Sequence, residues 1–260
     1  SFTPAPDFHG IVSSFKWQGA TSSNNASLPD HVLITISPVN DAPSGTDKEI
    51  LLAVNESGRV LTESDFGFTD SNDADLYTFE GIKIASLPVS GNLKLNNINV
   101  IVGQYIPVDA INSSFLSFTP GKNETGKPYA TFSFQVKDNG GQENGGIDLD
   151  QIPNIITIIV APLPTIELGS ANPSICVGSE SATIKYNSVN GDPLPNIFNI
   201  SWNNAAKAAG LADITNKVLG SGIISIDGLL NIAAGNYQGT LTVRNSSNLI
   251  LSAGLPISIL

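Results

Sequence analysis

The chain has 260 residues, with 12 Lys and Arg against 23 Asp and Glu, and a formal net charge of −11. An acidic surface of this kind repels nucleic acid and anionic membranes, so we expect neither as a partner. The single cysteine, Cys176, excludes an internal disulfide or a cysteine zinc site, and we expect it to be a small buried hydrophobe. No apolar run approaches the ~20 residues that a membrane span requires.

The chain contains an internal repeat. The segment SFTPAPDFHGIVSSFKWQ at 1–18 returns as SFTPGKNETGKPYATFSFQ at 117–135. Each copy then continues into an apolar strand that ends at a proline, VLITISPVNDAP at 32–43 and IITIIVAPLP at 155–164. A period of about 115–125 residues corresponds to one β-sandwich. The repeat therefore predicts tandem all-β sandwiches of the immunoglobulin or cadherin-like kind.

The first part, 1–39, is expected to be the C-terminal fragment of a preceding cadherin-like repeat. It would supply two terminal strands, with Phe2, Phe15 and Trp17 facing inward and the run at 32–34 buried. Such a fragment lacks its partner strands, so we expect it to be incomplete as a fold.

Residues 40–161 are expected to form one complete cadherin-like sandwich. Asn96-Asn97 separates two short apolar ribbons and predicts a hairpin turn. The run YATFSFQV at 129–136 alternates and would place its two phenylalanines and Val136 on one face. The run 155–160 predicts a strand buried on both sides or nearly so.

Residues 162–260 are expected to form a PKD-like or immunoglobulin-like sandwich with one short helix, reached through a stiff linker at Pro162 and Pro164. Asn203-Asn204 would cap the helix, and Gly210 would lie near its end. The expected strands lie at about 166–169, 182–187, 197–202, 223–227, 237–244 and 255–260.

Five motifs in order carry a resemblance to a known family. They are VNDAP at 39–43, FTDSNDADLYTF at 68–79, LPVSGNLKL at 87–95, LSFTP at 116–120 and FSFQVKDNGG at 132–141. Together they resemble the cadherin-like tandem repeats of very large bacterial surface adhesins. The resemblance covers 40–161 and the tail of another copy in 1–43.

The last part is similar to a PKD-like module through SICVGSESATIKY at 174–186 and GNYQGTLTVRNSS at 235–247. Such modules recur in type IX-secreted adhesins of gliding bacteria. The two resemblances imply an extracellular, cell-surface stalk that presents a distal adhesive tip and transmits force, as in gliding motility. The implied partners are neighbouring β-sandwich repeats of the same polypeptide, with surface glycans or other cell-surface proteins beyond them.

Calcium is the one ligand for which the sequence argues, because hard cations need several oxygen donors that converge in a small loop. Four candidate donors crowd into residues 70–75, two lie in the linker that enters the 40–161 domain, and one opens the DNGG loop. In cadherin-type arrays such groups bind Ca²⁺ and stiffen the joint between repeats. The candidate ligands are Asn40, Asp41, Asp70, Asn72, Asp73, Asp75 and Asp138.

A purely structural role for these residues stays open, because Asp and Asn also populate solvated turns and bond the local backbone there. The cluster is not an EF-hand loop, since Ala74 and Leu76 stand where that loop needs a ligand and a glycine. The second linker, 161–164, contains no acid. We expect proline stiffness and packing, without calcium, at that joint.

We predict that the segment is not an enzyme. Its two histidines, His9 and His31, are interpreted as exposed surface residues, and no motif of a serine hydrolase, zinc protease or phosphate-binding loop occurs. Asp148 and Asp150 form a carboxylate pair of the type that glycosidases use. We interpret this pair as part of an exposed strand edge or loop.

A binding function of another class stays open: one sandwich is a glycan-binding module of a secreted multidomain protein or enzyme. Aromatic side chains bind sugars by stacking, although aromatics at alternating strand positions more often belong to the core, which is our interpretation of Trp17 and Trp202. The aromatic candidates are Trp17, Trp202, Tyr105, Tyr129, Tyr186 and Tyr237.

Overall fold

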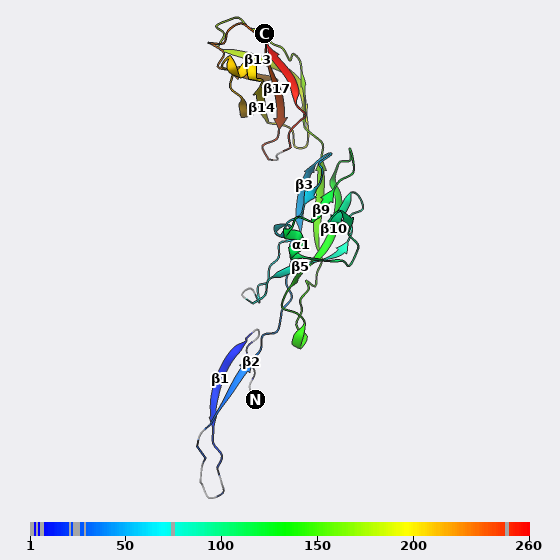
Figure 1. Ribbon diagram of the computed structural model, residues 1–260, viewed down its shortest axis with the longest axis vertical. Coiled ribbons are helices and arrows are strands. Elements are labelled where there is room, and N and C mark those ends of the chain that lie inside the picture. The colour runs from blue at the N-terminus through cyan, green and yellow to red at the C-terminus, as the bar shows by residue number, and fades with distance from the viewer. Residues whose placement is uncertain are drawn as a thin grey trace. The chain divides into compact units, whose positions relative to one another are not determined.

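The computed structural model describes residues 3, 5, 8–20, 22, 27, 28, 30–73, 76–247 and 250–260, with the side chains of residues 12, 13 and 15 outside the description. Strands dominate this part of the chain, which confirms the predicted all-β class (Figure 1). The chain divides into two compact units. One comprises Ser1–Ile50, Gly58–Thr119 and Ala130–Thr157, and the other comprises Leu51–Ser57, Pro120–Tyr129 and Ile158–Leu260. The predicted division of the chain into 1–39, 40–161 and 162–260 stays a prediction.

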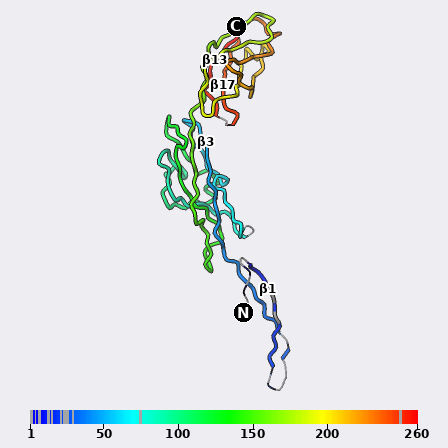
Figure 2. The backbone as a smooth tube through the Cα atoms, turned by 180° about the vertical axis from the view of Figure 1, so that it is seen from behind, coloured from blue at the N-terminus to red at the C-terminus, as the bar shows by residue number. Residues whose placement is uncertain are grey.

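The first strands, β1 (Gly10–Trp17) and β2 (Asp30–Ile36), pair as an antiparallel two-stranded sheet (Figure 2). The prediction that Trp17 and the 32–34 run are buried is wrong: Trp17 is 51% exposed, and Leu33 is 59% exposed. Two strands alone have no second layer against which to bury a face, and such hairpins are marginally stable in water. The predicted inward positions of Phe2 and of the Phe15 side chain lie outside the described residues.

The next sandwich pairs a five-stranded sheet, in the order β3-β11-β10-β5-β8, with a four-stranded sheet, in the order β4-β9-β6-β7. The helix α1 packs against β5 and β8 (Figure 1). The elements are β3 (Lys48–Ala53), β4 (Arg59–Val60), η1 (Glu63–Asp65), β5 (Phe79–Ser86), β6 (Asn92–Leu95), β7 (Ile98–Asn99), β8 (Tyr105–Pro107), α1 (Val108–Asn112), β9 (Leu116–Thr119), β10 (Gly126–Asp138), η2 (Glu143–Gly145) and β11 (Asn154–Ala161).

The alternation in β10 builds the core of this sandwich. Phe132, Phe134 and Val136 are all buried, as predicted, and the Phe134 ring meets the edge of Phe66 with 5.0 Å between centroids. The predicted turn between β6 and β7 is confirmed, because Asn96 and Asn97 have φ values of 48° and 64°.

The strand β11 is less enclosed than predicted. Its burial alternates, and Ile155 is 44% exposed, so one face packs on the core and the other meets solvent. Its neighbours β3 and β10 supply hydrogen bonds on both edges without covering that second face.

The last sandwich pairs a three-stranded sheet, β12-β13-β16, with a four-stranded sheet, β15-β14-β17-β18. Its core includes Ile184 and Ile224 from the first sheet and Trp202 and Leu241 from the second, and the buried position predicted for Trp202 is confirmed. The strand β15 was not predicted. The elements are β12 (Thr165–Leu168), β13 (Ser181–Asn190), β14 (Ile197–Trp202), α2 (Asn204–Ala208), β15 (Ile214–Val218), β16 (Ile223–Asp227), β17 (Tyr237–Arg244) and β18 (Leu255–Ile259).

The predicted short helix is α2. Its N-cap is Asn203, whose side chain accepts a hydrogen bond from the Ala206 N–H at 2.9 Å, and Gly210 follows with a φ of 105°. The cap satisfies one free backbone donor, and the glycine takes a left-handed conformation that other residues adopt at a cost.

Candidate metal centre

Four of the predicted calcium ligands are buried in the first compact unit. Asn40 is 4% exposed, Asp70 7%, Asp73 5% and Asp138 0%. Carboxylates are seldom buried to this degree unless they are paired or bind a metal. These four residues therefore differ from ordinary solvated turn residues.

Asn40 ties the entering chain to the loop that follows β10. Its Nδ2 donates to Asp138 Oδ1 at 2.9 Å, to Gly141 O at 3.2 Å and to Ile147 O at 2.9 Å. Its backbone carbonyl also accepts a hydrogen bond from the Ile147 N–H at 2.9 Å. The side-chain nitrogen thus serves the fold, and only the side-chain oxygen of Asn40 is left for a ligand.

Glycines allow this close contact. A Cβ added at Gly140 would lie 2.0 Å from Asn40 Oδ1, and one added at Gly146 would lie 3.1 Å from Asn40 Cβ. Neither glycine was among the residues predicted from the sequence to form the site. The glycine doublets at 140–141 and 145–146 were the available signal, because glycine marks places where another group approaches the backbone closely.

The 70–73 segment forms a second wall of the cluster. Asp70 Oδ1 accepts the Asp73 N–H at 3.1 Å, which closes a turn, and Asp73 Oδ2 accepts the Asp41 N–H at 2.6 Å. The side chain of Asn72 is exposed. Asp75, the remaining candidate in this loop, lies outside the described residues. The structure thus links Asp41, Asp70 and Asp73 to one another and leaves Asn72 on the surface.

Three oxygens in the cluster have no hydrogen-bond donor among the described residues: Asn40 Oδ1, Asp70 Oδ2 and Asp138 Oδ2. A buried acceptor without a partner costs about 1–3 kcal/mol, and more when it carries a charge. A cation bound to these oxygens would remove that cost. The donor types, two carboxylates and an amide oxygen, are those that hard cations prefer.

The electrostatic environment of Asp138 also favours a positive ligand. Burial raises the pKa of the Asp138 carboxyl, and the nearby Asp70 and Asp148 carboxylates raise it further, against hydrogen bonds from the Gly140 N–H and Asn40. Burial, which is the largest cause, and the two neighbouring carboxylates all disfavour a further negative charge at this buried place. A divalent cation would reverse this effect by neutralising the carboxylates.

The cluster provides only part of a calcium shell. Within the described ranges, no group of three or more His, Cys, Asp or Glu side chains is arranged to hold a metal ion. Calcium takes 6–8 oxygen ligands, so backbone carbonyls or water would have to supply the remainder. The donors fit a hard cation in chemical type and in burial.

The interpretation of Asp148 and Asp150 as exposed is wrong, because they are 7% and 6% exposed. Asp150 accepts hydrogen bonds from the Gly45 and Ile152 N–H groups, both at 2.9 Å. These two backbone donors stabilise the buried Asp150 carboxylate, and the role of Asp150 is therefore structural.

Asp148 belongs to an ion network with Lys137. The Lys137 amine contacts Asp148 Oδ2 at 3.2 Å and also contacts Glu80. Burial would raise the pKa of Asp148, but hydrogen bonds from Gln142 and Lys137 hold that pKa below its ordinary value. Asp148 is therefore a paired carboxylate, unlike a glycosidase acid, whose pKa is raised.

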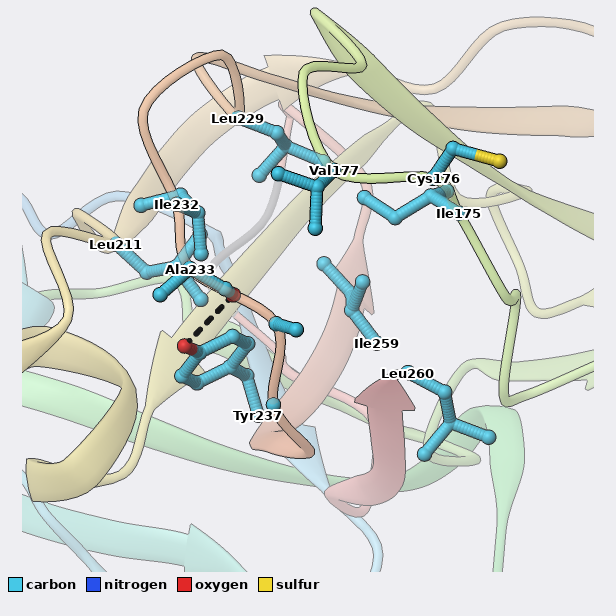
Figure 3. Close-up of a pocket in the computed structure, with 12 residues that line it drawn as sticks. Ile175, Cys176, Val177, Leu211, Leu229, Ile232, Ala233, Tyr237, Ile259 and Leu260 are labelled. Atoms are coloured by element: carbon cyan, nitrogen blue, oxygen red, sulfur yellow. Dashed lines mark hydrogen bonds between the residues drawn. The ribbon is translucent and has the colours of Figure 1, made fainter.

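Cys176 is exposed, so the prediction of a buried thiol is wrong. It lies in a loop before β13, where its carbonyl accepts the Ser179 N–H at 3.1 Å. Figure 3 shows its sulfur directed away from the apolar pocket of about 70 Å³ that Leu211, Ile232 and Tyr237 help to line. The neighbouring Ile175 is partly buried and packs against the core instead.

The side chains of His9 and His31 are exposed, as interpreted from the sequence. None of the helices in the described part of the chain has the length and hydropathy of a membrane-spanning segment.

No protein-family model matches the chain. No curated protein matches it either. Solved structures that are similar include Drosophila N-cadherin EC1-4, with 13% identity, a TM-score of 0.32 and coverage of 98% of this chain and 59% of that one. The human Desmocollin-1 ectodomain has 14% identity, a TM-score of 0.35 and coverage of 95% and 47%. Drosophila OTK extracellular domains 3-5 have 13% identity, a TM-score of 0.36 and coverage of 94% and 77%.

The chain thus spans 59% and 47% of the lengths of the first two of these structures. The TM-scores are low and carry no argument about fold or function. The all-β sandwich class rests on the sheets themselves.

Proposed function

We propose that this chain is a non-catalytic, extracellular segment of a cell-surface adhesin, a stalk of tandem β-sandwiches in which Ca²⁺ binds where the chain enters the 40–161 sandwich. The three buried oxygens of Asn40, Asp70 and Asp138 without donors carry the calcium part of this proposal. The repeated SFTP segments and the two sandwiches support the stalk.

A cation at this cluster would connect three segments that are distant in sequence. Asn40 belongs to the entering chain, Asp70 to the loop before β5, and Asp138 to the end of β10. Holding all three through one ion would restrict the loops and stiffen this end of the sandwich. Asp41, Asp73, Asn72 and Asp75 remain proposed contributors through side-chain or backbone oxygens.

Calorimetric titration with Ca²⁺ and thermal unfolding in Ca²⁺ or EDTA test the metal site. We expect Ca²⁺ to raise the unfolding midpoint of the 40–161 sandwich, because a ligand present at about 100 times its Kd stabilises the folded state by about 2.7 kcal/mol. Asp70→Asn and Asp138→Asn should each abolish the rise. Glu49→Gln is the matched control, since Glu49 is an exposed acid on β3.

Two results would remove calcium from the proposal: no heat and no shift in the midpoint of the wild-type chain, or an equal shift in Asp70→Asn. Neither would affect the stalk. Pulling single chains with and without Ca²⁺ would test force transmission, where the bound ion should raise the unfolding force of one sandwich only.

The sequence resemblance extends the proposal to giant bacterial adhesins that are secreted by the type IX route and used in gliding. Neighbouring repeats are the proposed partners in the stalk, and surface glycans or proteins are the proposed partners at its tip. Antibodies to this segment should label intact cells, and a strain without type IX secretion should lose the label. A label that persists in that strain would contradict the secretion route.

A further inference from the structure

An open groove lies on the outer face of the four-stranded sheet of the last sandwich. Its volume is about 770 Å³, within the ~300–1,000 Å³ range of small-molecule sites. The sheet presents Ile200 and Leu241 to the core, so the alternate residues Ser201 and Thr240 point outward and are exposed. The groove therefore presents the solvent-facing side chains of Ser201 and Thr240, and the buried Trp202 and Ile257 also line it.

Strand pairing arranges these side chains in two adjacent rows. Ser201 on β14 lies opposite Thr240 on β17, and Thr240 lies opposite Pro256 on β18. In the next row Gln238 lies opposite Ser258. Neighbouring strands are about 4.8 Å apart, which is close to the length of one pyranose ring. The groove is lined by Ala171, Asn172, Ser201, Trp202, Asn203, Gln238, Gly239, Thr240, Pro256, Ile257 and Ser258.

The lining is polar but carries no charge. Its functional groups are hydroxyls and carboxamides, which both donate and accept hydrogen bonds. Across the described residues, no hydrogen bond involves the side chains of Ser201, Gln238 or Thr240, so their capacity is available to a ligand. Asn203 is partly engaged, because its oxygen caps α2.

The edge beside this groove is not open to an added strand. The N–H groups of Ser258 and Leu260 already donate to Ala171 and Pro173, both at 3.1 Å, and the Ile175 N–H donates to Leu260 O at 3.0 Å. An extended peptide therefore cannot pair with β18, the usual way in which a sheet edge binds peptides. The groove instead offers side-chain groups that match a ligand rich in hydroxyls.

We infer that this groove binds a neutral oligosaccharide. Ser201, Gln238 and Thr240 contact sugar hydroxyls, and the Pro256 ring lies against the apolar C–H face of a sugar. Trp202 does not stack on the ligand, because it is 3% exposed and lies beneath Gly239. Without an aromatic platform the affinity is modest, with a Kd of about 1 mM, or about −4 kcal/mol.

This inference goes beyond the proposed stalk, because it makes the last sandwich itself an adhesive element. It does not depend on calcium, since no residue of the metal cluster lines the groove. Binding measured in EDTA therefore separates the two proposals: glycan binding can fail while the metal site stands, and the reverse also holds.

Saturation-transfer and amide chemical-shift NMR on the full 260-residue chain test the inference. The probes are maltotriose, cellotriose and triacetylchitotriose, with 3′-sialyllactose as an anionic comparison and a neutral hexapeptide, Gly-Ser-Asn-Gly-Ser-Gln, as a peptide comparison. We expect saturable shifts at Ser201, Gln238 and Ser258 with at least one neutral trisaccharide, in EDTA as well as in Ca²⁺.

The variant Gln238→Ala/Thr240→Val should weaken this binding about 30-fold, because two hydrogen bonds of about 1 kcal/mol each are removed. Thr183→Val is the matched control: Thr183 is an exposed threonine on β13 of the opposite sheet and should leave binding unchanged. The inference is overturned if no neutral saccharide binds saturably, if the double variant binds as tightly as the wild type, or if the shifts lie outside the groove. Tighter binding of the hexapeptide or of sialyllactose at this face would also overturn it.

Discussion

Replacing Asn40 with alanine should destabilise the 40–161 sandwich by about 3 kcal/mol. The side chain donates to Asp138 at 2.9 Å, to Gly141 O at 3.2 Å and to Ile147 O at 2.9 Å. A hydrogen bond to a charged group contributes about 1.5–3 kcal/mol and a neutral one about 1 kcal/mol. An amide nitrogen has only two hydrogens, so three contacts share two donors. The expected loss of about 3 kcal/mol therefore counts one hydrogen bond to a charged group and one neutral hydrogen bond.

Differential scanning calorimetry in EDTA gives the loss of stability, and hydrogen–deuterium exchange of peptides covering 138–147 shows where the structure opens. We expect faster exchange in that loop for Asn40→Ala. Asn72→Ala is the control, because Asn72 is an exposed asparagine in the neighbouring loop, and it should change stability by less than about 0.5 kcal/mol. A loss under about 1 kcal/mol with unchanged exchange would refute the reasoning that Asn40 ties the entering chain to this loop.

Two further predictions concern other sites. Burial would raise the pKa of Asp65, but Lys48 at 2.8 Å, the Thr62 N–H and Arg59 hold it below the ordinary value. The stability that comes from a lowered pKa is present above the unfolded-state pKa and is lost as the pH falls through the folded-state pKa. In the Asp65→Asn variant, the free energy of unfolding measured with urea should therefore fall less steeply at acid pH than in the wild type. An unchanged slope at acid pH would contradict this prediction. Cys176 is exposed, so it should react with a colorimetric thiol reagent in the native chain, and a reaction that requires denaturant would count against its placement.

Local sequence rules succeeded where one residue type decides the backbone. Asn96 and Asn97 take positive φ values at the hairpin turn, as their type predicted. Asn203 caps α2, and the alternation of β10 buries Phe132 and Phe134. In each case the physical cause acts within a few residues, so it can be recognised without the rest of the fold.

The predictions about burial failed where the answer depended on which strands and side chains pack around a residue. Trp17 has a typical core pattern but is 51% exposed, because its described sheet has only two strands. Asp148 was interpreted as exposed, yet Lys137, nearby on β10, makes its burial possible. Cys176 is exposed, and the adjacent Ile175, which is partly buried, packs against the core. The residue type at one position does not determine which neighbouring side chains cover it in the folded chain.

The candidate metal site stays a prediction, and the sequence showed the crowding of its candidate donors but not their geometry. The crowding of Asp70 and Asp73 was visible in the sequence, and both are buried. The tie from Asn40 to Asp138 spans 98 residues, and only the folded chain shows which oxygens it leaves without donors. The distinction between Asn72, which is exposed, and its acidic neighbours also depends on the turn that Asp70 closes.

The placement of the two tryptophans determines what optical unfolding experiments can detect. Trp17 is 51% exposed on the first hairpin, and Trp202 is 3% exposed in the last core, where its indole N–H has no acceptor among the described residues. Their emission should therefore differ in wavelength, with Trp202 the bluer of the two. The sandwich between them contains tyrosine but no tryptophan, so a fluorescence titration excited at the indole band will follow both flanking parts and miss the module with the buried aspartates.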